Sequence, residues 1–313
     1  MKGLELSRAF YEACGKPMLT RDFPHLLPLI AVGLVGSGSE CFGYDDEYSQ
    51  DHDFEPGFCI FLPSEEVLDR KSAFALERAY AKLPREFMGY RRTPLSPVGG
   101  NRHGVIRVGD FFRDKTGTED GRLALRDYFF IPEQSLAEAT RGEVFFDGLG
   151  AFSEIRARLA YLPEDVRKKK LAGHVLTMGQ AGLYNYPRLV ARGDEGGAQL
   201  ALFEFAKSAL HAIFLLNRVY LPYYKWVYRA LADLARFSEL SQPMAVLLTT
   251  GNSQREAKEK EDIVGQICKT IFSALLGDEL SDYAGDTAEG HAYSINDRIE
   301  STEIRNLHIL YGV

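Results

Sequence analysis

The order of apolar and polar positions predicts strands in the first third of the chain and helices after it. Leu29 to Val35 is an apolar run of strand length, and glycines and serines interrupt it at 36–39. Extended or aromatic-rich runs predict further strand segments at 51–54, 58–62 and 104–108. Helices are predicted at 5–14, ended by Gly15-Lys16-Pro17, and from Ser64 to about Leu83, ended by Pro84.

Beyond Asp110 the apolar positions take on helical spacing and strand-like runs nearly vanish. The pattern predicts helices at 136–140, 151–161, 164–182, 199–220, 223–237 and 256–276. We therefore predict an α+β fold with two domains. An N-terminal domain with a short mixed sheet and helices occupies residues 1–148, and an all-helical C-terminal domain occupies residues 149–313.

Composition and charge narrow the classes of protein. The chain has 313 residues, of which 45% are hydrophobic, and a net charge of -7. Acidic and basic residues are interspersed, so no basic stripe indicates a nucleic-acid partner. The four cysteines are scattered without a C-x-x-C pair, which predicts reduced thiols and a cytoplasmic protein. The longest apolar stretch, 25–36, carries Pro28 and is shorter than the roughly 20 residues that span a bilayer, so no membrane span is predicted.

The candidate chemistry lies in Gly36-Ser37-Gly38-Ser39 and in Ser49-Gln50-Asp51-His52-Asp53. If 51–54 is extended, Asp51 and Asp53 project to the same side and His52 to the other. Two adjacent carboxylates repel, and a hard divalent cation compensates them, so we predict a Mg²⁺ site. Gly36 and Gly38 let the backbone approach phosphate oxygens, with the hydroxyls of Ser37 and Ser39 as further donors. Each half alone is a weak signal, and the order strand, glycine turn, Asp-x-Asp is more specific.

In this order the sequence resembles the DNA polymerase beta-like nucleotidyltransferases, a superfamily that includes the aminoglycoside nucleotidyltransferases. It looks most like a bacterial branch that is filed as a domain of unknown function. The strings at 145–150, Phe-Phe-Asp-Gly-Leu-Gly, and at 217–226, from Asn217 to Trp226, also resemble that branch, so the resemblance covers most of the chain.

The resemblance implies transfer of a nucleoside monophosphate from a nucleoside triphosphate, with ATP the first expectation, to an acceptor hydroxyl that it does not identify. It also implies a third carboxylate on a neighbouring strand, where residues 104–108 offer Arg107 instead. Asp110, just past that strand, is our candidate for the catalytic set with Asp51 and Asp53. Glu55 and Glu86 are the alternatives. If none converges, the protein binds nucleotide without turning it over.

Several other residues have two interpretations. Ser49 either bonds a phosphate or the Asp51 carboxylate, or caps a turn. Arg218 and Lys225, set among aromatic residues, could face the triphosphate, although the aromatic residues themselves are typical of packing. Lys168-Lys169-Lys170 is typical of a solvated helix face. Arg102 and His103 are expected at the surface, with a contact to the acceptor as the alternative.

Overall fold

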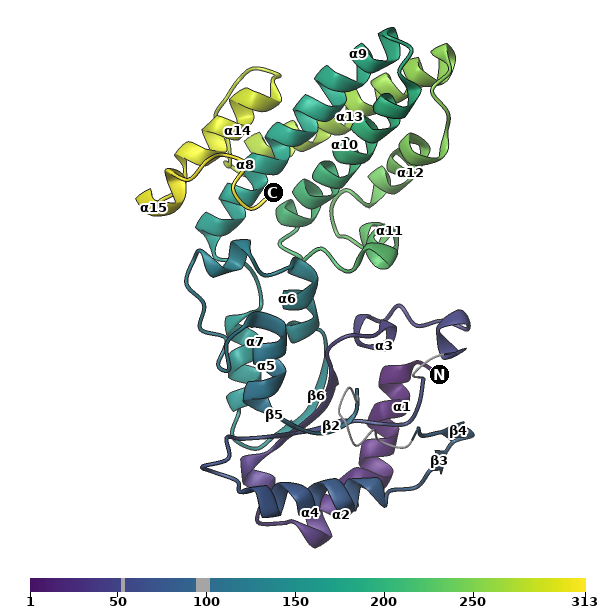
Figure 1. Cartoon of the computed structure of the whole chain (residues 1–313), viewed down its shortest axis with the longest axis vertical. Coiled ribbons are helices and arrows are strands. Elements are labelled where there is room, and N and C mark those ends of the chain that lie inside the picture. Colours follow the sequence, from purple (N-terminus) through teal and green to yellow (C-terminus); the bar gives the residue numbers. More distant parts are fainter. Residues whose placement is uncertain (52–53, 94–101) are drawn as a thin grey trace. The chain divides into compact units, whose positions relative to one another are not determined.

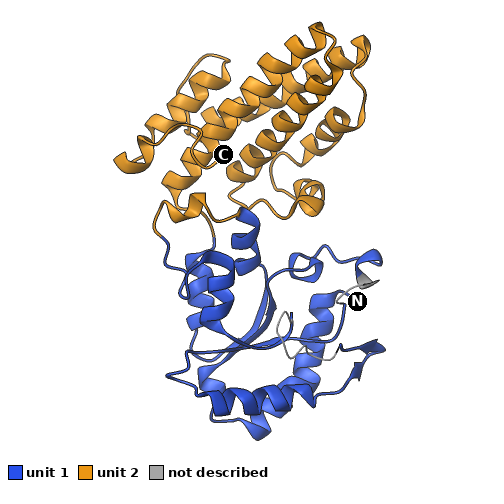
Figure 2. Cartoon of the chain, viewed as in Figure 1, with its two compact units in different colours: residues 1–123, 133–160 blue, residues 124–132, 161–313 orange. Residues whose placement is uncertain are grey.

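The computed structural model describes residues 1–51, 54–93 and 102–313, with the backbone alone for Gln50 and Asp51. The chain divides into two compact units (Figure 2). Unit 1 comprises residues 1–123 and 133–160, and unit 2 comprises residues 124–132 and 161–313. A mixed sheet with helices in unit 1 and a helical unit 2 confirm the predicted α+β fold. The predicted boundary after Gly148 differs from this division because α7 (Ala151–Arg158) packs against β6 (Gly142–Asp147) in unit 1.

The sheet of unit 1 has four strands in the order β5-β2-β1-β6 (Figure 1). Three of these strands match predicted strands: β1 (Ala31–Val35), β2 (Cys59–Leu62) and β5 (Gly104–Arg107). Strand β1 is antiparallel to both β2 and β6, and β2 is parallel to β5. The expectation that strands vanish after Asp110 is wrong for β6, a half-buried strand that pairs with β1.

Strand β2 is buried on both sides because helices cover both faces of this sheet. Ile60 and Leu62 face a core shared with α1 (Gly3–Phe10), α2 (Lys16–Asp22) and α4 (Arg70–Ala81). Phe61 points the other way and stacks on Phe152 of α7, with ring centroids 4.1 Å apart. The remaining elements are α3 (Ser39–Phe42), α5 (Val108–Thr116), α6 (Glu133–Thr140) and the hairpin β3 (Glu86–Phe87)–β4 (Tyr90–Arg91).

The predicted helix stop at Gly15-Lys16-Pro17 is wrong, because α1 continues through a π-helical turn, Tyr11–Gly15, into α2. The Lys16 N–H bonds to the carbonyl of Tyr11, five residues back. A proline ring clashes with the carbonyl of a regular helical turn, and a wider turn before it relieves that clash. Unit 2 repeats the arrangement: α8 (Glu164–Met178) passes through the π turn Gly179–Asn185 into α9 (Tyr186–Ala191), which contains Pro187.

Unit 2 is built around the long helices α8 and α10 (Glu195–Leu216). They pack with α13 (Gln254–Gly277) and α14 (Ala288–Asp297), and α11 (Val227–Ala232), α12 (Ser241–Thr249) and α15 (Thr302–Arg305) complete the unit. The predicted helix at 223–237 is instead a 3-10 turn at Tyr224–Trp226 followed by α11. Helix α10 is long and apolar enough to cross a membrane, but 61% of its apolar window is buried inside the protein, as in the core helix of a soluble protein.

The lysine run on α8 does not form the expected solvated face. Lys169 is fully buried and Lys170 is 6% exposed. The Lys169 ammonium donates to Oδ1 of Asn296 at 2.8 Å and to the carbonyls of Arg305 and Leu307 at 3.1 and 2.6 Å. The run therefore contains two buried lysines, and one of them, Lys169, holds the C-terminal segment in place.

Candidate functional site

The glycine turn predicted after the first strand is present and connects β1 to α3. Gly36 and Gly38 have φ angles of +111° and +117°, a backbone region in which any residue with a Cβ is strained. At Gly38 an added Cβ would also overlap the guanidinium of Arg102. Only glycine therefore lets the backbone and this cation come so close.

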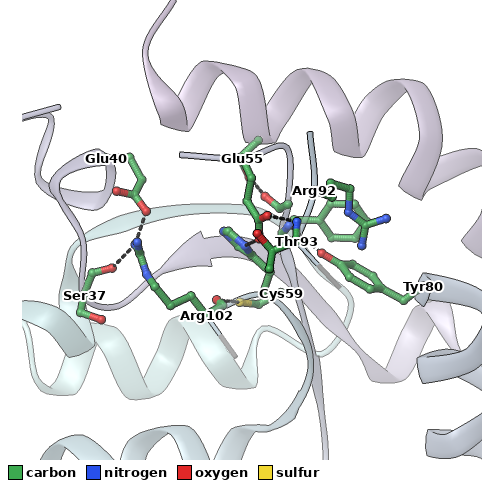
Figure 3. A network of polar contacts seen from close by, with 12 residues as sticks. Ser37, Glu40, Glu55, Cys59, Tyr80, Arg92, Thr93 and Arg102 are labelled. Carbon is green, nitrogen blue, oxygen red and sulfur yellow. Dashed lines mark hydrogen bonds and ion pairs between the residues drawn. The ribbon is translucent and has the colours of Figure 1, made fainter. Parts of the chain in front are cut away.

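Arg102 holds the turn in place (Figure 3). Its Nη2 donates to the carbonyl oxygen of Ser37 at 2.7 Å and forms an ion pair with Glu40 of α3. Only 25% of the Arg102 side chain and 10% of the Glu40 side chain are exposed. The expected surface position of Arg102 is thus wrong, because this cation bridges the turn and the helix that follows it.

A second polar pair lies beside the first, centred on Glu55 (Figure 3). The Glu55 carboxylate lies 3.2 Å from Nδ1 of His103 and accepts the backbone N–H of Thr93. His103 is buried rather than at the surface, and its ring packs on Gly57, where a Cβ would lie 2.6 Å from Cγ. Burial alone would raise the pKa of Glu55, but the hydrogen bonds from His103 and Thr93 outweigh it and lower the pKa. Glu55 is therefore a carboxylate at neutral pH.

The lowered pKa makes a prediction about acid stability. A carboxylate with a depressed pKa stabilises the folded state above its ordinary pKa, and that contribution is lost as the pH falls through the folded value. We expect Glu55→Gln to be less stable than wild type at neutral pH, with a difference that shrinks below pH 4.5, the ordinary pKa. Urea titrations across the acid range measure it, and Glu47→Gln, an exposed carboxylate, is the control. If the difference in unfolding free energy between wild type and Glu55→Gln did not change with pH, the pKa of Glu55 would not be lowered in the folded state.

Strand register places these groups at one edge of the sheet. The end of β1, where Val35 pairs with Gly142, lies at the same edge as the starts of β2 and β5, where Cys59 pairs with Gly104. Glu55 comes before β2, and Arg102 and His103 come directly before β5. The turn, the cation and the Glu55–His103 pair therefore form one cluster.

The other two candidates for a third carboxylate lie elsewhere. Asp110 follows the far end of β5, because α5 begins there, and its 62% exposed side chain pairs with Arg113. This position at the opposite edge of the sheet argues against the catalytic assignment of Asp110. Glu86, also 62% exposed, lies on the β3–β4 hairpin near Arg91. Of the three candidates, Glu55 is the one that the structure brings to the glycine turn.

The predicted metal ligands fall largely outside the described residues. Asp51 ends a 3-10 turn, Tyr48–Asp51, so the strand predicted from residue 51 is wrong at its start. His52 and Asp53 lie outside the described residues, and the convergence of Asp51 with Asp53 stays a prediction. In the described ranges no three His, Cys, Asp or Glu side chains gather in a way that could hold a metal ion. The Ser49 hydroxyl bonds the backbone of Asp46, accepting its N–H at 2.7 Å, which is the turn-capping alternative.

Arg218 and Lys225, the predicted partners of the triphosphate, belong to unit 2. Arg218 has a φ of +54° and forms an ion pair with Glu164 at 2.8 Å. The Lys225 ammonium lies 4.8 Å from the centroid of the Trp226 ring, a cation–π contact. These contacts account for both side chains within their own unit, and their role toward a nucleotide stays a prediction.

One part of the chain matches a known family. No curated protein matches it. Residues 128–227 match the model of a family described as a domain of unknown function (DUF4037). The match includes the strings at 145–150 and 217–226, which lie outside the glycine turn. The chain thus contains a DUF4037 domain at residues 128–227.

Proposed function

We propose that the protein transfers a nucleoside monophosphate from a nucleoside triphosphate, ATP first among them, to an acceptor hydroxyl, as the DNA polymerase beta-like nucleotidyltransferases do. The acceptor oxygen forms a bond to the α-phosphorus while the bond from that phosphorus to the bridging oxygen breaks. Pyrophosphate leaves, and the proton of the hydroxyl passes to a base. The cytoplasm is the proposed location, in line with the reduced cysteines.

The observation that carries the proposal is the glycine turn between β1 and α3, with a cation fixed against it. Backbone N–H groups in such turns, together with a nearby guanidinium, are suited to phosphate oxygens. Arg102 is held against the turn by the carbonyl of Ser37 and the carboxylate of Glu40, so a guanidinium is already in place there, with Glu40 balancing part of its charge. Charge that is positioned in advance is what phosphoryl transfer requires most.

Glu55 is the proposed base toward the acceptor, in place of the carboxylate that residues 104–108 lack. It is ionised at neutral pH, lies at the same sheet edge as the turn, and comes two residues after Asp53. His103 orients it through the contact to Nδ1. Mg²⁺ would be held by the carboxylates of Asp51 and Asp53, oxygen ligands that suit this ion, and would neutralise charge on the triphosphate and the leaving pyrophosphate.

Nucleotide binding gives the first test. We expect ATP with Mg²⁺ to raise the thermal midpoint of the wild-type protein, since a ligand at a hundred times its Kd stabilises the folded state by about 2.7 kcal/mol. Gly38→Ala should reduce this nucleotide-induced shift, because its methyl group displaces Arg102. Gly43→Ala is the matched control: its φ is +74°, so the backbone is strained too, but nothing lies within 4 Å of an added Cβ.

Incubation with α-labelled ATP then separates an enzyme from a silent binding protein. A labelled adenylylated product supports transfer. ATP-dependent stabilisation without product for any acceptor offered would leave a catalytically silent nucleotide-binding protein as the function. An equal midpoint shift in the Gly38 and Gly43 variants would place the nucleotide away from this turn.

A further inference from the structure

A groove of about 650 Å³ lies between α2 and α4 in unit 1. The two helices lie at the bottom of Figure 1. Its floor is apolar and includes Met18, Ala79 and Leu83. All of its lining comes from residues 14–23 and 71–84, on the outer side of the helices that cover the sheet. The groove is therefore separate from the glycine turn and from the function proposed for it.

The rim of the groove is positively charged, although the whole chain carries a net charge of -7. Lys71 and Arg78 lie on α4 and Lys82 is its C-cap, and their spacing of seven and four residues puts them on one face of the helix. None of the three forms an ion pair with another described residue. By contrast, Arg70 next to them pairs with Glu65, and Arg21 across the groove pairs with Asp22.

The helix dipole favours Arg78 and Lys82 at the C-terminal end of α4, but two other features of this charge arrangement are unfavourable within the protein. Arg78 and Lys82 are like charges at i and i+4, which repel one another on a helix. Lys71 lies in the first turn of α4, where the helix dipole disfavours a cation. An anionic partner would relieve both effects.

Phe74 adds exposed apolar surface between these cations. It lines the groove with 58% of its surface exposed, and the Arg78 guanidinium carbon lies 5.9 Å from the centroid of its ring. A partner that covers Phe74 and the apolar floor while placing carboxylates beside the rim would satisfy both kinds of surface. An amphipathic helix that lies in a groove between two helices has these properties.

We propose that the α2–α4 groove docks an acidic, amphipathic segment of a partner protein, with its apolar side chains on the floor and its carboxylates at Lys71, Arg78 and Lys82. A protein segment fits better than single-stranded nucleic acid, because nucleic-acid sites stack successive bases on several aromatic rings. Here the lining has two rings, the exposed Phe74 and the half-buried Phe23, and the floor is otherwise largely aliphatic.

The test uses the full chain and a fluorescent synthetic helical peptide with leucines on one face and glutamates on the other. We expect it to bind, and we expect Arg78→Glu/Lys82→Glu to weaken binding by about tenfold or more, because the variant repels the acidic face. Lys207→Glu/Lys269→Glu makes the same change in net charge at exposed lysines of α10 and α13 and should bind as wild type does. Thermal midpoints of both variants verify folding.

Cys14 gives a second readout at the groove itself. It is half-buried in the lining, whereas Cys41, Cys59 and Cys268 are buried. Burial raises the pKa of the Cys14 thiol, so its alkylation is followed at alkaline pH. The bound peptide should slow alkylation of Cys14 in the wild type and in the Lys207/Lys269 variant.

Three outcomes would overturn the proposal. The first is no binding of the Leu/Glu peptide, or equal binding of peptides in which Lys replaces Glu or Ser replaces Leu. The second is equal affinity of the groove variant and its control, or unchanged alkylation of Cys14. The third is tighter binding of an oligothymidylate that protects Cys14 and depends on Arg78 and Lys82, which would assign the groove to nucleic acid.

Discussion

Asp51→Asn and Asp53→Asn are each expected to lower Mg²⁺-dependent pyrophosphate release by on the order of a thousandfold, because the amide withdraws the charge that positions the metal ion and the triphosphate. Folding of the Asp51 variant should be unaffected, since Asp51 ends a short 3-10 turn rather than lying in a core strand. A coupled pyrophosphate assay with ATP and Mg²⁺, run beside thermal denaturation, measures both.

The control for this pair is Glu47→Gln, which removes an exposed carboxylate from the same segment and should keep wild-type turnover. Turnover that survives both aspartate substitutions would show that the metal site has been assigned to the wrong residues. A loss that appears equally in Glu47→Gln would point to the net charge of the segment instead.

Lys169→Met is expected to destabilise unit 2 by about 3 kcal/mol, because three acceptors lose a charged donor while the apolar stem stays in place, and each orphaned acceptor costs roughly 1 kcal/mol or more. The acceptors belong to Asn296, Arg305 and Leu307, so the C-terminal segment should loosen first. Urea denaturation measures the free energy of unfolding, and hydrogen exchange at residues 296–307 locates the loss.

Lys168→Met on the same helix is the control, because the Lys168 ammonium donates to one described acceptor, the carbonyl of Arg298 at 2.9 Å. It should cost about 1 kcal/mol or less. If Lys169→Met were as mild as this control, the buried ammonium would not be what fixes the C-terminal segment.

Local signals in the sequence are enough to predict strand β1 and the turn at Gly36 and Gly38. An apolar run that ends in glycines specifies both without help from the rest of the chain. Strand β6 was missed because its pairing with β1 joins residues more than a hundred positions apart. The helix through Pro17 was missed because periodicity does not report a π turn that absorbs a proline.

The candidate site shows the same contrast between local signals, which the sequence reveals, and contacts between distant residues, which it does not. The turn was found from its own residues, but Arg102 reaches Ser37 and Glu40 only because β5 pairs with β2 in parallel. That pairing also brings His103 to Glu55 and takes Asp110 to the far edge of the sheet. The burial of Lys169 could not be predicted from the sequence either, because its acceptors lie in a distant segment of the chain.

The division of the chain into units limits how the protein can be recombined. The chain passes from one unit to the other after residues 123, 132 and 160, so no single cut separates them. A cassette of residues 161–313 would lack Phe129, whose ring meets that of Tyr311 at 5.2 Å between centroids. A gene fusion that exchanges the helical unit must therefore carry residues 124–132 as a second insert, and a single crossover at residue 160 would leave Tyr311 without the ring of Phe129.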